Sequence, residues 1–164
     1  MIKLKDIILE IESLSELTAA DIHNNYEGPT AQKYNISAIF KDFNPKTNIL
    51  TFKVWDSFGS GSYHIVKIQM LDYNSIKSSD DTVENKLTKT LKDGNLRVYC
   101  SCGSYIYNGF AYTSYILGGG LKKVTRKPMI RNPKELGIAC KHIKGLLQKI
   151  HVYIPIIAKK IKQI

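Results

Sequence analysis

Two short pairs of cysteine and histidine residues constrain this chain more than any other feature of its sequence. One residue separates Cys100 from Cys102, one residue separates Cys140 from His142, and a spacer of 37 residues lies between the pairs. The pairs use all three cysteines of the chain and one of its four histidines. Thiolate and imidazole are ligands that zinc prefers, and Cys3His is one of the closed tetrahedral sets of structural zinc sites. The spacing therefore predicts one metal site.

The two pairs predict different local structures around the ion. If residues 96–102 are extended, side chains two positions apart leave the same face of the strand, so the thiols of the first pair point the same way. Gly103 would then let the backbone turn under the ion. Two residues along a helix differ by about 200° around its axis, so Cys140 is expected just before a helix and His142 in its first turn. The N-terminus of that helix would favour thiolates.

Other interpretations of the cysteines stay open at this point. A disulfide between Cys100 and Cys102 would close a very small strained ring and leave Cys140 unpaired. A redox-active CxC pair is possible chemistry, but it gives no role to Cys140 and His142. Buried cysteines that bind nothing are the third interpretation. We favour the metal, and we expect a structural rather than a catalytic ion because four protein ligands leave no open position.

The motif CxC, a spacer and CxH resembles the SWIM-type zinc domain. The match falls on Cys100, Cys102, Cys140 and His142 and covers roughly residues 96–150, with a longer spacer than in ordinary members. The resemblance implies a structural zinc ion and a role in binding DNA or protein.

A second resemblance extends further along the chain. The chain is similar to small virion structural proteins of tailed bacteriophages in the order of three segments. These are a β-rich N-terminal half, then VYCSCGSYIYNGFAY, then RNPKELGIACKHIKGLL. It implies a non-enzymatic assembly protein of the virion, made in the host cytoplasm, whose partners are larger capsid, neck or tail proteins. The alternative function is a SWIM-type module that binds DNA or RNA.

Hydrophobic periodicity predicts an α+β fold. Leu4, Ile7, Ile8 and Ile11 have helical spacing and predict an N-terminal amphipathic helix, and a second short helix is expected within residues 15–25. From residue 34 the period changes to two, with turns at 44–46 and 59–61, which predicts a three-stranded antiparallel meander. A short helix through Val83, Leu87 and Leu91 would connect the meander to the metal-binding half.

The spacer between the cysteine pairs is expected to be a long basic loop. An aromatic cluster is followed by three glycines at 118–120, which predict a flexible stretch. Five cations then lie within ten residues and are candidates for binding a protein partner or nucleic acid: Lys122, Lys123, Arg126, Lys127 and Arg131. A solvated basic loop that binds nothing is the alternative. After the spacer, apolar residues at helical spacing predict a helix over residues 143–150.

The charge distribution divides the chain. Residues 1–90 carry a net charge of −2 and residues 91–164 a net charge of +12. We expect residues 1–94 to form the helix and sheet, and residues 95–164 to form the metal module with its basic loop and C-terminal arm, the two making one compact unit. The tail after Pro155 is expected to cover the core or to anchor in a partner.

Neither catalysis nor a membrane span is expected. No nucleophile motif, phosphate-binding glycine loop or suitably spaced carboxylate pair accompanies His23 or His64. The apolar run Val152–Ala158 contains Pro155 and is far shorter than the roughly 20 residues of a membrane-spanning helix.

Overall fold

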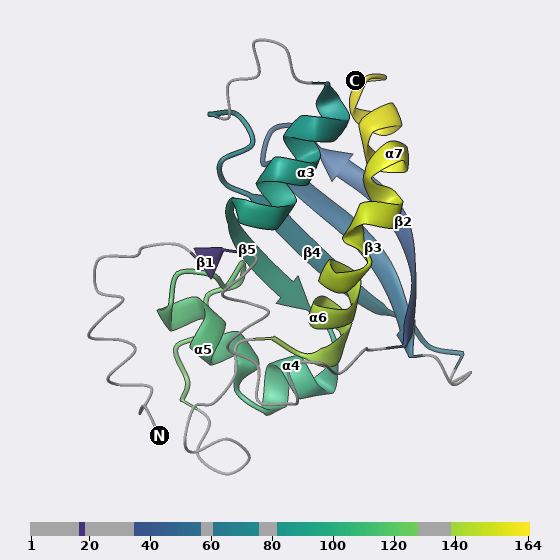
Figure 1. The fold of residues 1–164 in the computed structure, drawn as a ribbon. Helices are drawn as coiled ribbons and strands as arrows, with labels where there is room; N and C mark the ends of the chain where they lie inside the picture. The colour runs from purple at the N-terminus through teal and green to yellow at the C-terminus, as the bar shows by residue number, and fades with distance from the viewer. Residues whose placement is uncertain (1–16, 19–34, 57–60, 76–81, 128–138) are drawn as a thin grey trace.

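The protein is an α+β domain built around one antiparallel sheet (Figure 1). The computed structural model describes residues 17–18, 35–56, 61–75, 82–127 and 139–164. The strands are β1 (Leu17–Thr18), β2 (Ile36–Asn44), β3 (Ile49–Asp56), β4 (His64–Met70) and β5 (Asn95–Cys100), in the spatial order β1-β5-β4-β3-β2. The helices are α3 (Val83–Asp93), α4 (Gly103–Tyr107), α5 (Phe110–Ile116), α6 (Lys141–Gln148) and α7 (Ile150–Ile161).

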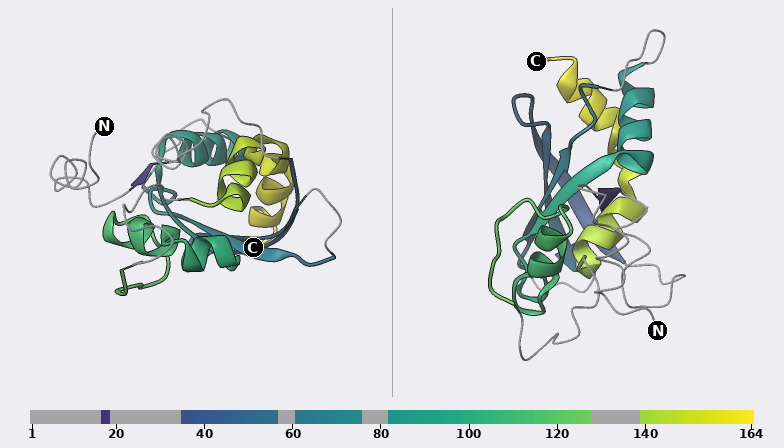
Figure 2. Two further views of the ribbon diagram at one scale, coloured as in Figure 1. Left: turned by 90° about the horizontal axis from the view of Figure 1, so that it is seen from below. Right: turned by 90° about the vertical axis from the view of Figure 1, so that its left-hand side faces the viewer.

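Helices lie on both faces of the sheet, and they cover one face more fully than the other (Figure 2). Alternate residues of β3, β4 and β5 are buried, because successive side chains of a strand point to opposite faces. The helices α3, α6 and α7 cover this inner face, and α4 and α5 lie on the other side of the sheet, near β5. The core formed between the sheet and α3, α6 and α7 includes Leu50, Phe52, Ile68, Leu91 and Ile143.

The predicted meander and connecting helix are confirmed. β2, β3 and β4 pair in sequence order as antiparallel neighbours, and α3 follows them. Thr82 caps α3 by accepting a hydrogen bond from the backbone N–H of Asn85. The amphipathic helix predicted for the N-terminus lies outside the described residues.

The helix predicted within residues 15–25 is wrong at Leu17 and Thr18, and the rest of that segment lies outside the described residues. These two residues form β1 and pair with Leu96 and Asn95 of β5. The reason is tertiary: this edge of β5 offers backbone donors and acceptors, and pairing with them competes with a short isolated helix.

The long loop predicted between the cysteine pairs is also wrong in its first part, which forms α4 and α5. Burial of Tyr105, Ala111 and Leu117 stabilises these helices, although each has only one or two turns. The glycines after α5 are not a free linker, because Val98 of β5 donates a hydrogen bond to the Gly119 carbonyl and accepts one from the N–H of Leu121.

The C-terminal residues form two consecutive helices that cover the core. The predicted helix appears as α6, the backbone turns at Lys149, and α7 continues through Pro155 to Ile161. Lys149 Nζ and the Tyr153 hydroxyl donate hydrogen bonds to carbonyls of β2, at 2.8 Å each. Because β2 is an edge strand, these bonds occupy acceptors that another chain could otherwise use.

Residues 95–164 share their sheet and core with the preceding part of the chain, since β5 pairs directly with β4. None of the helices in the described ranges has the length and apolar character needed to cross a membrane.

Candidate metal centre

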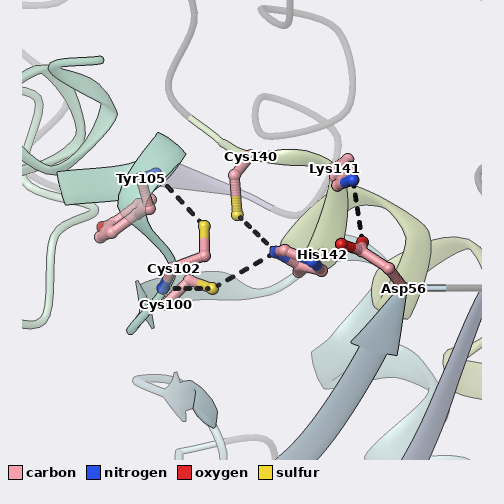
Figure 3. Close-up of polar contacts among 7 residues, drawn as sticks. All are labelled: Asp56, Cys100, Cys102, Tyr105, Cys140, Lys141 and His142. Atoms are coloured by element: carbon pink, nitrogen blue, oxygen red, sulfur yellow. Dashed lines mark hydrogen bonds and ion pairs between the residues drawn. The ribbon is translucent and has the colours of Figure 1, made fainter. Parts of the chain in front are cut away.

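The four predicted ligands lie together in one buried cluster (Figure 3). The Sγ atoms of Cys100, Cys102 and Cys140 and a ring nitrogen of His142 are all within 4.8 Å of one another. His142 Nδ1 is 3.8 Å from the Cys100 sulfur and 3.9 Å from the Cys140 sulfur. Each residue is at most 3% exposed. No disulfide joins the three cysteines, so the disulfide interpretation is excluded in this structure.

The first cysteine pair is positioned by the end of β5 and the start of α4. Cys100 is the last residue of β5, opposite Val66 of β4. Ser101 fixes the following turn, because its backbone N–H donates to the Ile65 carbonyl and its hydroxyl accepts from the Ile65 N–H. Cys102 is therefore in extended conformation just beyond the strand, as the N-cap of α4.

Backbone donors orient two of the sulfurs. The N–H of Cys102 points at the Cys100 sulfur, at 3.5 Å, and the N–H of Tyr105 points at the Cys102 sulfur, at 3.3 Å. A turn was predicted at Gly103, but Gly103 is the first residue of α4 and does not have a left-handed conformation. The sulfurs thus meet N–H groups that stabilise negative charge.

The second pair has the predicted arrangement. Cys140 is the N-cap residue of α6, in extended conformation, and His142 lies in the first turn. The backbone carbonyl of Cys140 accepts from the N–H of Lys144, which closes that turn. The positive end of the α6 dipole therefore points toward the sulfurs.

A second group of polar residues surrounds His142. Its Nε2 is 2.9 Å from Oδ1 of Asp56 at the end of β3, and Lys141 Nζ is 2.9 Å from the same oxygen. The ring of His64 lies 4.5 Å from the His142 ring, centroid to centroid. Lys141 therefore contacts the carboxylate. Sequence reasoning missed Asp56, because its place opposite His142 depends on the packing of α6 on the sheet.

The ionisation of these groups is strongly coupled. Hydrogen bonds with Cys100 and Cys140 lower the pKa of Cys102. Hydrogen bonds with Cys102 and Cys140 raise the pKa of Cys100. Burial raises the pKa of Cys140 to about 12. Three thiolates at this distance repel one another in a medium of low dielectric constant, so full deprotonation needs a compensating cation.

His142 and Asp56 favour each other's charge. Burial lowers the pKa of His142, but the hydrogen bonds and charges of Cys102 and Asp56 outweigh burial and raise it. The hydrogen bond from Lys141 is the largest cause that lowers the pKa of Asp56, and His142 adds to it. Asp56 is therefore a carboxylate and accepts a hydrogen bond from His142.

The donor set fits a small, thiophilic metal ion. A tetrahedral ion with metal–sulfur bonds of about 2.3 Å and metal–nitrogen bonds of about 2.0 Å separates its sulfur and nitrogen ligands by roughly 3.5 Å. The observed sulfur-to-nitrogen distances of 3.8 and 3.9 Å are close to this separation. The four residues can thus bind a metal ion after small adjustments.

The predicted basic residues are separate from this cluster. Lys122, Lys123, Arg126 and Lys127 are exposed on the segment that follows α5. Arg131 lies outside the described residues.

No protein-family model matches the chain, and it has no match among curated proteins or solved structures. The cluster itself is therefore the strongest indication of function.

Proposed function

We propose that the chain is a non-enzymatic zinc-binding module in which Cys100, Cys102, Cys140 and His142 bind one structural Zn²⁺. The observation that carries the proposal is the convergence of four buried donor atoms to within 4.8 Å of one another. Thiolate sulfur and imidazole nitrogen favour zinc over hard cations such as Mg²⁺ and Ca²⁺. The SWIM resemblance, which rests on the same four residues, supports the choice.

A structural role follows from the ligand count and from where the ligands come from. Four protein side chains fill a tetrahedral shell, so no position is left for a substrate. The ligands belong to the end of β5, the start of α4 and the start of α6. An ion there would link the sheet to helices on both sides of it, and free energy of metal binding would contribute to folding.

Metal analysis tests the proposal. Protein purified under reducing conditions should contain one zinc per chain, and a strong chelator should remove the zinc and lower the midpoint of thermal unfolding. Protein that is stably folded without any metal, and whose unfolding zinc does not change, would contradict it. Thiol–disulfide exchange activity in such metal-free protein would favour the redox interpretation.

We further propose that the module acts by binding larger proteins of a virion. The virion is suggested by the resemblance to small virion structural proteins, and an exposed apolar pair on α7, Val152 at 59% and Ile156 at 56% exposure, offers a surface for a protein partner. These residues are one helical turn apart and therefore form one patch. Mass spectrometry should find the chain in purified particles, and a Val152→Ser/Ile156→Ser double variant should retain zinc but be incorporated less. Equal incorporation would contradict binding through this patch.

The exposed cations after α5 favour one alternative, a module that binds DNA or RNA. Lys122, Lys123 and Arg126 could contact phosphates there. Such binding loses affinity steeply as salt concentration rises, whereas an apolar protein interface does not. Absence of DNA or RNA retention at low salt would exclude this alternative.

A further inference from the structure

The outer face of the sheet combines aromatic rings with positive charge. The residues of β3, β4 and β5 that alternate with the buried ones point away from α3, α6 and α7. They are Ile49, Thr51, Lys53, Trp55, Ile65, Lys67, Gln69, Asn95, Arg97 and Tyr99, and all are partly exposed. The charged residues of this set are all basic. We call it the outer sheet face.

One end of the outer sheet face is aromatic. The rings of Trp55 and Tyr63 lie 5.6 Å apart, centroid to centroid, and Tyr63 is 45% exposed. Lys53 Nζ lies 4.0 Å from the centre of the Tyr63 ring. The ammonium group lies over one face of the ring, so a planar group can stack on the other face while the cation binds an attached anion.

The cations form a diagonal across three strands. Lys53 of β3 pairs with Ile65, Lys67 lies two residues further along β4, and Arg97 of β5 pairs with Gln69, two residues further still. One strand and two residues separate each cation from the next, which is about 8 Å at ordinary sheet spacings. Asp42, at the bulge of β2, does not belong to this set, and its carboxylate lies 3.9 Å from Lys160 of α7.

The diagonal leads to the basic segment after α5. Arg97 Nε donates a hydrogen bond of 3.2 Å to the carbonyl of Gly118. This segment, which includes the exposed Lys122 and Lys123, lies on the same side of the sheet as α4 and α5 (Figure 2). The aromatic rings therefore lie at one end of the diagonal of cations, and further cations lie at its other end.

We propose that the outer sheet face binds single-stranded nucleic acid, with bases stacked on Trp55 and Tyr63 and phosphates along Lys53, Lys67 and Arg97. Regularly spaced cations complement a polyanion, and the partly exposed Trp55 and exposed Tyr63 rings complement unpaired bases. A duplex fits less well because its bases are already stacked on one another and have no free face for the rings. An acidic protein would use the cations but not the rings.

The proposal goes beyond zinc binding and can fail independently of it. Trp55 is the only tryptophan of the chain, so its fluorescence reports stacking directly. Oligo(dT) and oligo(U) of about 20 nucleotides should quench this fluorescence in the zinc-loaded protein, and the affinity should fall linearly with salt concentration on a log–log plot. Zinc content measured on the same samples separates loss of binding from loss of the metal site.

Variants that keep the reporter locate the site. Tyr63→Ala and Lys67→Gln should each weaken oligonucleotide binding about tenfold. Lys89→Gln on α3 removes the same charge from an exposed position of the opposite layer and should change affinity less than about twofold. Circular dichroism and zinc content should match the wild type in all three.

Several outcomes would overturn the proposal. One is the absence of quenching and of retention at low salt by zinc-loaded protein. Another is equal weakening by Lys67→Gln and Lys89→Gln, which would indicate attraction to net charge alone. A third is loss of binding in a Lys122→Gln/Lys123→Gln variant while Tyr63→Ala binds normally, which would place nucleic acid on the basic segment only. Polyglutamate binding as tightly as oligo(dT) would indicate an acidic protein partner.

Discussion

Asp56 Oδ1 lies 2.9 Å from Nε2 of His142, although the residues are 86 positions apart in the chain. The carboxylate accepts from Nε2, so in the neutral ring Nδ1 keeps its lone pair, and Nδ1 lies 3.8 Å from the Cys100 sulfur and 3.9 Å from the Cys140 sulfur. Carboxylates that accept from a metal-binding histidine in this way fix its orientation and raise its basicity. Asp56 is thus a positioning residue for the proposed zinc site.

Replacing this carboxylate should weaken metal binding without abolishing it. Asp56→Ala removes the acceptor for His142, and we expect zinc affinity to fall about 10- to 100-fold. Competition with a chromophoric chelator measures the change. Asp93→Ala, at an exposed carboxylate on α3, is the control and should bind zinc like the wild type. Unchanged affinity in Asp56→Ala would show that the hydrogen bond does not support the ligand.

Loss of one ligand should have the same effect as loss of the ion. Cys140→Ser replaces a buried cysteine at the start of α6 and should lower the free energy of unfolding by at least about 3 kcal/mol in reducing buffer. Denaturant unfolding followed by circular dichroism gives the value. A chelator should destabilise the wild type by a similar amount and the variant hardly at all. Further destabilisation of the variant by chelator would mean that its metal is bound elsewhere.

The hydroxyl of Tyr105 should contribute to stability but not to metal binding. It donates to the Val98 carbonyl at 3.0 Å and is 2.8 Å from the Ser114 hydroxyl, in a buried position. Tyr105→Phe should cost about 1 kcal/mol at unchanged zinc content. Tyr107→Phe is the matched control, because Tyr107 is 68% exposed, and it should have no measurable effect. Equal unfolding midpoints for the two variants would contradict this expectation.

Gly120 should not tolerate a side chain. A Cβ there would lie 2.6 Å from Cα of Tyr115, a distance that backbone atoms cannot accommodate without moving. Gly120→Ala should destabilise the protein by about 2 kcal/mol, because the added methyl group would push Tyr115 of α5 away from the segment that pairs with β5. Gly103→Ala would meet only the Tyr107 ring, at 3.5 Å, and serves as the comparison. Thermal unfolding should separate the two variants clearly, and similar midpoints would refute the steric argument.

Adjacent isoleucines of α7 should differ sharply. Ile157 is fully buried and Ile156 is 56% exposed. Ile157→Ala should cost about 2–5 kcal/mol, since it leaves a cavity in the core, and Ile156→Ala less than about 0.5 kcal/mol. Chemical denaturation of both variants tests whether the C-terminal residues are part of the core. A small effect of Ile157→Ala would mean that α7 contributes little to folding.

The sequence alone determined the features that depend on local pattern. Alternating apolar residues predicted β2, β3 and β4, and helical spacing predicted α3 and α6. Residue type and spacing identified all four candidate metal ligands, because thiols and an imidazole in such short pairs have few other roles. The place of Cys140 before α6 followed from helical geometry, which requires no knowledge of distant contacts.

Only the tertiary structure decided what depends on contacts between distant parts of the chain. α4 and α5 lie where a loop was expected, because packing of α4 on β5 and of α5 on α4 stabilises helices too short to persist alone. Residues 17 and 18 pair with the free edge of β5, and α7 continues through Pro155 because its apolar side packs on the sheet. Asp56 contacts His142 of the candidate metal centre because α6 packs on the sheet. A local pattern specifies which residues can be buried or can bind a metal, but their partners are set by how the whole core is packed.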